Sequence, residues 1–181
     1  MTTYEYNRDH AVEYAKRWAL GRNPLFGNFT GMGGDCANFA SQCILAGTCQ
    51  MNFTDTFGWY FENYNNRAPA WTGVPYLYNF LTTNKGVGPF GKEMPVEELE
   101  LGDIIQLGTT TDSFYHTLVI TGASDCGWLI SCHTDDALER PLCTYDYRHC
   151  RGIHIEGFRC AGRNCRRNCF RNLIDGKKIF A

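Results

Sequence analysis

The sequence predicts an α+β domain in which the helices come first and an antiparallel sheet follows. Two stretches, residues 8–20 and 35–46, carry the helical signals of the N-terminal half. From residue 100 onward, β-branched and aromatic residues gather in short runs bounded by turn-forming residues. Helices followed by consecutive strands are typical of the α+β class.

The first predicted helix, residues 8–20, has one apolar face. Asn7 is suited to the N-cap position, and Gly21 followed by Pro24 ends the run. The spacing that defines the buried face is that of Ala11, Tyr14, Ala15 and Trp18.

The second predicted helix, residues 35–46, follows a loop rich in Gly and Asn and is apolar nearly all round. A helix of this kind is buried in the protein interior. Asp35 is expected to be its N-cap and Gly47 its C-cap.

The second half of the chain predicts strands. The stretch 48–95 is aromatic and punctuated by Gly and Pro, and we expect it to be irregular apart from a short helix at 75–83. A tight turn at Ser124–Gly127 joins two of the predicted strands into a hairpin. The four predicted strands are residues 101–107, 116–122, 128–134 and 152–158.

We expect one domain, residues 1–158, which ends with the last predicted strand, and a basic appendage rich in Cys and Arg, residues 159–181. The net charge of the 181 residues is −2, which argues against a dedicated nucleic-acid binder. Residues 1–140 contain 8 Lys and Arg against 16 Asp and Glu, whereas residues 141–181 contain 9 against 3. The tail, with five arginines, is a solvated basic segment or a docking site for an anionic partner.

No apolar run is long enough for a membrane span, and the first ten residues lack a secretory pattern. On its face this indicates a cytoplasmic protein, or an exported one if a leader was removed. We expect a monomer.

The chain contains 10 cysteines, and two interpretations compete. In an exported protein they indicate disulfides, and in a reducing compartment they indicate free thiols or metal ligands. No CxxC pair is present, so the usual zinc and thioredoxin patterns are absent. Scattered thiols explain His149, Cys150, His154 and Cys160 better than a zinc site does, and we expect neither metal nor cofactor.

Cys36 is the first candidate for catalysis. It follows a Gly-Gly-Asp turn and opens the buried helix, where unpaired N–H groups and the helix dipole stabilise a thiolate and lower its pKa. The same N–H groups can stabilise an oxyanion. A buried structural cysteine is the alternative.

His116 is the candidate base, because it begins a strand after a polar loop. The hairpin that follows supplies a possible third residue, which would orient the imidazole. If the turn is centred between Ser124 and Asp125, His116 faces His133. If it is centred one residue later, His116 faces Asp135. The tighter turn favours His133.

Several segments together resemble the putative amidase domain family of Gram-positive bacteria, which belongs with the CHAP and NlpC-type papain-like cysteine amidases and peptidases. The resemblance covers about residues 6–158, and the block DCANFASQC is its most specific part. The other segments, in order, are NRDHAVEYAKRWAL, the Asn-Pro pair, the aromatic stretch, LGDII, HTLVITG and CHTDD.

The resemblance implies a papain-like fold with Cys36 as nucleophile, His116 as general base and His133 as third member. In NlpC-type relatives the Asp before the nucleophile helps to bind a substrate amine, and Asp35 occupies that place. Trp59 and Trp71 could line a cleft, although most such aromatics belong to the core.

The implied function is hydrolysis of an amide bond through a thioester, with a peptidoglycan-derived or other small peptide as substrate. Two alternatives remain open. One is a papain-like binding module without catalytic activity, and the other is an intracellular amidase that acts on a peptide unrelated to the cell wall.

Overall fold

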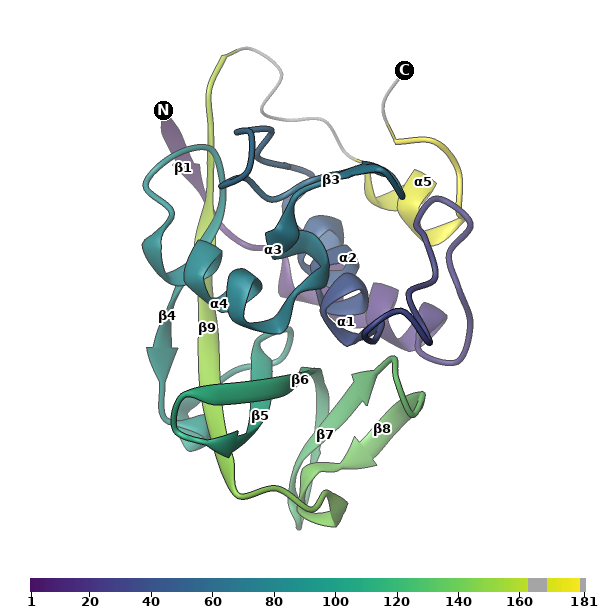
Figure 1. Ribbon diagram of the computed structural model, residues 1–181, viewed down its shortest axis with the longest axis vertical. Helices are drawn as coiled ribbons and strands as arrows, with labels where there is room; N and C mark the ends of the chain where they lie inside the picture. The colour runs from purple at the N-terminus through teal and green to yellow at the C-terminus, as the bar shows by residue number, and fades with distance from the viewer. Residues whose placement is uncertain (163–168, 180–181) are drawn as a thin grey trace.

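The computed structural model describes residues 1–162 and 169–179 and has the predicted α+β architecture (Figure 1). Its strands are β1 (Thr2–Tyr4), β2 (Phe61–Asn63), β3 (Asn66–Arg67), β4 (Gly88–Met94), β5 (Ile104–Thr110), β6 (Ser113–Ser124), β7 (Gly127–Cys132), β8 (Ala137–Pro141) and β9 (His149–Cys160). Within the described residues, the main antiparallel sheet has 7 strands in the order β1-β9-β5-β6-β7-β8, and β4 also pairs with β9. The strands β2 and β3 form a separate hairpin.

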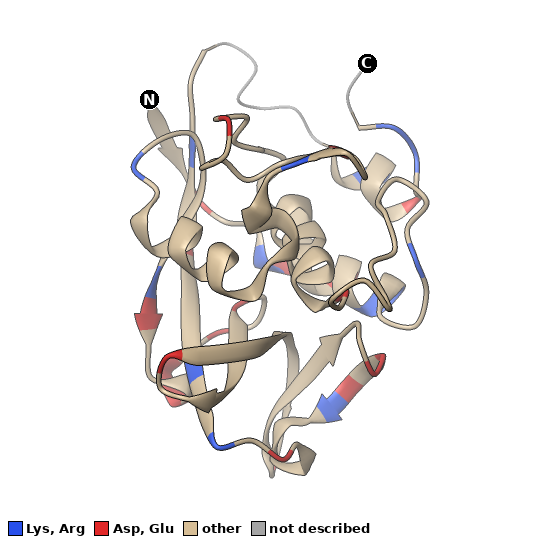
Figure 2. Ribbon diagram, in the orientation of Figure 1, with Lys and Arg blue, Asp and Glu red and all other residues tan. Residues whose placement is uncertain are grey.

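The helices are α1 (Arg8–Trp18), α2 (Cys36–Thr48), α3 (Pro69–Thr72), α4 (Val74–Thr83) and α5 (Phe170–Ile174). In Figure 1, α1 and α2 lie side by side, and both pack against β6. The helices α2, α3 and α4 contain no charged residue and are entirely tan in Figure 2. Their apolar side chains and one face of the sheet form the larger core. None of the described helices is long and apolar enough to cross a bilayer.

Both predicted N-terminal helices are present, and one of their ends differs from the expectation. The Asn7 side chain accepts a hydrogen bond of 3.0 Å from the His10 backbone N–H, so Asn7 is the N-cap of α1. The helix α2 continues through Gly47, which is not its C-cap; the cap is Cys49, in the left-handed conformation with φ 51°. Gly47 lies where a Cβ would collide with the Tyr6 ring, so its role is close packing.

The predicted strands are found with shifted ends, and the sequence missed β1, β4 and β8 of the main sheet as well as the β2–β3 hairpin. The largest omission is β4, which lies in the stretch that was expected to be irregular and has two glycines and a proline. Gly91 packs against the His154 carbonyl of β9 with no room for a Cβ. Close strand approach therefore explains a glycine that the sequence pattern suggested was a breaker.

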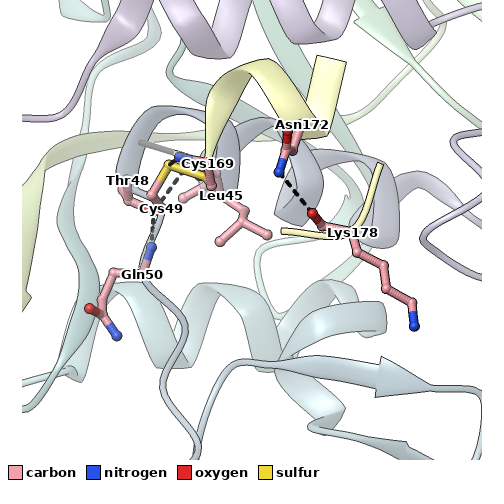
Figure 3. Close-up of a disulfide and its surroundings, with 8 residues drawn as sticks. Leu45, Thr48, Cys49, Gln50, Cys169, Asn172 and Lys178 are labelled. Atoms are coloured by element: carbon pink, nitrogen blue, oxygen red, sulfur yellow. Dashed lines mark hydrogen bonds between the residues drawn. A yellow bond between two sulfur atoms is a disulfide. The ribbon is translucent and has the colours of Figure 1, made fainter. Parts of the chain in front are cut away.

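The C-terminal segment packs against the domain rather than extending away from it. β9 continues to Cys160, and Phe170 and Leu173 of α5 are buried in the larger core. Figure 3 shows the disulfide between Cys49, at the end of α2, and Cys169, at the start of α5. Three of the tail arginines, Arg163, Arg166 and Arg167, lie outside the described residues.

The cysteines divide between both states that the sequence left open. A second disulfide joins Cys126 to Cys143 across the β6–β7 turn and the segment after β8. Four described cysteines are free thiols: Cys36, Cys43, Cys132 and Cys150. The free thiols include the candidate nucleophile.

The two disulfides should contribute unequally to stability. Cys49 and Cys169 are 120 residues apart, whereas Cys126 and Cys143 are 17 apart. In the chain-entropy description, removing the long-range bond by double Ser substitution should lower the free energy of unfolding by about 5 kcal/mol, and removing the short-range bond by about 3 kcal/mol. Urea unfolding of both variants tests this ordering, and a larger loss from the short-range bond would contradict it.

Candidate functional site

Cys36 begins α2, directly after a turn that only glycine adopts easily. Gly33 and Gly34 have φ values of 98° and 107°, in a region that other residues rarely occupy. This turn brings the chain sharply into the buried helix. Cys36 is 4% exposed, so its thiol lies close to the surface but is almost covered.

Burial raises the pKa of the Cys36 thiol, and this is the largest effect on it. Backbone N–H groups of Thr117, Ala37 and Cys36 itself act in the opposite direction, and the charge of Asp35 adds to the increase. The N–H groups at the start of the helix thus lower this pKa as expected, but burial outweighs them and the net shift is upward.

Thr117 is the important member of that group, because it lies on β6 next to His116. Its N–H acts on the Cys36 thiol across the contact between α2 and β6. The structure thus brings the start of α2 against the segment of β6 that carries the candidate base.

The Asp35 carboxylate is completely buried and has four partners, on three segments of the chain. Oδ1 accepts hydrogen bonds of 2.9 Å each from the Phe29 N–H and the Asn38 Nδ2. Oδ2 lies 2.7 Å from His133 Nδ1 and 3.1 Å from Arg22 Nε. This carboxylate therefore joins the loop before α2 to the turn after β7.

Two expectations for Asp35 are corrected by this geometry. Asp35 occupies the N-cap position, but its side chain makes no capping hydrogen bond, because the carboxylate points to Phe29 and His133. The carboxylate is also 0% exposed, so it is not available to a substrate amine in this structure.

His133 is fully buried, and both of its ring nitrogens are engaged. Nδ1 faces Asp35, and Nε2 lies 2.9 Å from the backbone carbonyl oxygen of Trp18, at the end of α1. Each ring nitrogen thus has its own hydrogen-bond partner. The ring also stacks on Phe39 at 4.1 Å. No ring nitrogen is left to orient His116.

The hairpin explains why neither predicted register is found at the site. Ser124 pairs with Gly127, so the turn residues are Asp125 and Cys126 and the favoured earlier turn is wrong. A bulge between Ile120 and Gly122 then shifts the pairing by one residue. β7 ends at Cys132, before any residue faces His116 in the sheet.

His116 is 8% exposed and lies 6.3 Å, ring to ring, from Tyr145. Burial lowers the pKa of its imidazole, and the charge of Asp135 partly offsets that decrease. Asp135 is thus the carboxylate that acts on this ring. Among the hydrogen bonds of the described residues, none joins His116 to the Cys36 thiol.

Trp59 and Trp71 are both 0% exposed, so neither lines a cleft. The Trp59 indole donates a hydrogen bond of 2.9 Å to Ser41, and the Trp71 indole donates one of 2.8 Å to Asn38. The two rings lie 4.8 Å apart and pack α3 against α2. They support the helix that carries Cys36.

Sequence reasoning missed Thr134, whose hydroxyl accepts a hydrogen bond of 2.8 Å from the Asp35 backbone N–H. Thr134 and Asp135 have φ values of 63° and 60°, a left-handed conformation that a Thr-Asp pair does not predict.

His154, which the sequence analysis considered for a zinc site, instead pairs with Asp103, at 2.8 Å from Nδ1 to Oδ2. No group of three potential metal ligands occurs among residues 1–162 and 169–179.

Comparison with known proteins identifies the family. The family model described as "Putative amidase domain" matches residues 5–155, so the chain belongs to that family. Amidases are enzymes that hydrolyse amide bonds. The chain is also 29% identical over 126 residues to the "Uncharacterized protein YhbB" of Bacillus subtilis (strain 168). The match covers 68% of this chain and 39% of that protein, and no solved structure matches the chain.

The Asp35–His133 pair should be a major source of stability. Substituting His133 by Ala leaves the buried Asp35 carboxylate without its closest partner, which typically costs about 3–5 kcal/mol. Lys16→Gln is the control, because it removes an exposed ion pair with Glu139, and the expected change is below about 1 kcal/mol. Chemical unfolding measures both, and equal effects would contradict the proposed importance of the buried pair.

Proposed function

We propose that this chain is a cysteine amidase of the papain-like, CHAP and NlpC type, with Cys36 as nucleophile and His116 as general base. One observation carries the proposal. The thiol at the start of a buried helix is acted on by backbone N–H groups of that helix and by the Thr117 N–H, from the strand that holds His116. Nucleophile, candidate oxyanion donors and base therefore belong to one contact between α2 and β6.

The directions of the two pKa shifts favour a neutral resting pair over an ion pair. The Cys36 pKa is raised and the His116 pKa is lowered, in both cases chiefly by burial. His116 then accepts the thiol proton as the sulfur attacks the amide carbon, which is general-base activation. In free enzymes such hydrogen bonds are often long and tighten only when substrate binds.

Amide cleavage then follows with a balanced set of proton transfers. As the C–S bond forms, the carbonyl oxygen becomes an oxyanion, which the backbone N–H groups of Cys36 and Ala37 can stabilise. The imidazolium of His116 protonates the leaving amine, and the C–N bond breaks to leave a thioester. His116 next deprotonates water, which attacks the thioester and releases the acid and the thiol.

We assign the two remaining residues separate roles. Asp135 raises the pKa of His116 and so stabilises the imidazolium, as a third catalytic member would. His133, bound to Asp35 and Trp18, holds the start of α2 in place and so positions Cys36. We further propose a cell-wall peptide, or a related small peptide amide, as the substrate.

Loss of the nucleophile should abolish amide hydrolysis. With digested peptidoglycan as substrate, Cys36→Ala should lower the rate by a factor on the order of 10⁶, to background, as for other nucleophiles that act with a base. Cys43→Ala is the matched control, because Cys43 is a buried free thiol of the same helix. New amines and shortened stem peptides are detected by mass spectrometry.

A Cys36→Ala variant that remains active would contradict the proposed mechanism. If neither wild type nor variant releases an amine from peptidoglycan, a panel of other peptide amides separates a different substrate from a binding module without catalysis.

The charge of Asp135 should be visible in the pH dependence. Because the His116 pKa lies below its ordinary value of 6.5, the base is neutral at pH 7, and activity should fall as the pH drops through that pKa. Asp135→Asn removes a charge that raises this pKa, so the acid limb of kcat/KM should move to lower pH. The pH midpoint of the titration followed by the His116 ring resonances should also move to lower pH.

Asp136→Asn is the control for this measurement, since that neighbouring carboxylate binds Arg22 instead. An acid limb that stays in place in Asp135→Asn would rule out Asp135 as the partner of His116.

A further inference from the structure

The strongest unassigned feature near the site is the Arg151 guanidinium of β9, which two aromatic rings and one amide hold in a single orientation. Its carbon lies 3.4 Å from the centre of the Tyr78 ring and 3.9 Å from that of Phe114. Nε and Nη2 donate hydrogen bonds of 2.9 Å and 2.6 Å to the same oxygen, Gln106 Oε1. Both faces and one edge of the cation are therefore occupied.

The opposite edge of the guanidinium has no such partner. Within the described part of the chain, Nη1 donates no hydrogen bond, and no carboxylate lies within ion-pair distance of Arg151. The direct partners of Arg151 are a neutral amide and two rings, and Glu93, which binds the Tyr78 hydroxyl, acts on the guanidinium only from beyond ion-pair distance. An arginine that only joined secondary structures would be expected to satisfy this edge as well.

A cavity of about 480 Å³ opens beside Arg151, with Tyr78 and Phe114 in its wall. Glu93 and Asp112 also line it, and Glu93 accepts a hydrogen bond of 2.6 Å from the Tyr78 hydroxyl. Those two acids repel additional negative charge, which disfavours a polyanion such as nucleic acid. The composition of the wall suits a ligand with one carboxylate, placed at the guanidinium.

The sheet register relates this cavity to the proposed nucleophile. Arg151 pairs with Gln106 of β5, and Gln106 pairs with Thr117 of β6, whose N–H acts on the Cys36 thiol. Gln106 Nε2 also donates to the Thr117 hydroxyl at 3.2 Å. Two strand spacings separate Arg151 from Thr117 along this row, about 10 Å. An extended peptide covers that distance in about three residues.

We propose that Arg151 binds a carboxylate of the substrate, two to three residues from the bond that Cys36 cleaves. The inference rests on the proposed function for its orientation toward Cys36, and it specifies the substrate class as a short peptide amide with a free carboxylate. Arg151 acts as a specificity residue, since its guanidinium offers a preorganised donor edge at low entropic cost.

The test uses a pair of thiol reagents that differ in one group, bromoacetyl-Ala-Ala and its C-terminal amide. Alkylation of Cys36 forms a C–S bond and releases bromide, and peptide mapping measures its rate. A Cys150→Ser background removes the exposed thiol that lines the same cavity. The free acid should react about tenfold faster than the amide, the factor that corresponds to 1.4 kcal/mol.

Arg151→Gln should abolish the preference for the acid, and Arg151→Lys should retain part of it, because the charge remains. Arg148→Gln is the matched control, as it removes the same charge three residues away, on an exposed side chain outside the cavity. Equal rates for acid and amide in the wild-type background would overturn the proposal, as would a preference that survives in Arg151→Gln.

A second readout does not depend on the thiol. Titration of wild type with acetyl-Ala-Ala should shift the Arg151 Nε–H resonance, whereas acetyl-Ala-Ala-amide should not. If the acid shifts this resonance but Cys36 is unreactive, the carboxylate site stands and the proposed hydrolysis fails. If neither peptide shifts it, the carboxylate site is wrong whatever the reactivity of Cys36.

Discussion

The buried Asp35 carboxylate is the interaction on which the candidate site depends. A carboxylate removed from water is costly unless charged or polar partners surround it, and this one has His133, Arg22, Asn38 and the Phe29 N–H. These partners come from the end of the β6–β7–β8 region, from the loop before α2 and from α2 itself. The chain cannot satisfy the carboxylate without bringing those segments together. The position of Cys36 is a consequence of that requirement.

The same requirement gives His133 a role unlike that of a ring-orienting residue. Its second nitrogen meets the Trp18 carbonyl, so the imidazole joins the last turn of α1 to the first turn of α2. Two helices that are adjacent in the core are thereby aligned at the ends that face the site. The residue that acts electrostatically on His116 is Asp135, two positions further along. In the proposed mechanism, two residues of one turn therefore have different roles: His133 is structural, and Asp135 acts on the base.

Burial is the main influence on both proposed catalytic groups, and it acts in complementary directions. It raises the pKa of an acid that becomes charged on ionisation, such as Cys36, and lowers that of a base such as His116. Both directions favour the neutral pair of the proposed mechanism, in which the thiol proton moves to His116 as the sulfur attacks the substrate. Arg151 of β9 continues the row of paired polar residues formed by Thr117 and Gln106. The sheet that carries the proposed base therefore also carries a cation, at a distance from Thr117 that an extended peptide spans in about three residues.

The sequence by itself determined the α+β class, the two N-terminal helices with the Asn7 cap, and the position of Cys36 at a helix start. These are local properties, set by apolar spacing and by glycines that permit the turn at Gly33 and Gly34. It also pointed to His116, because a histidine that opens a strand after a polar loop is conspicuous.

Only the tertiary structure decided what surrounds those residues. A single bulge between Ile120 and Gly122 changed the partner of every position beyond it, and no turn rule predicts a bulge. The contact of His133 with Asp35, 98 residues away, likewise cannot be read from the sequence, since a buried polar pair depends on which segments meet in the core. Burial reversed the expected direction of the Cys36 pKa for the same reason: the helix dipole is a local property, and desolvation is a property of the whole fold.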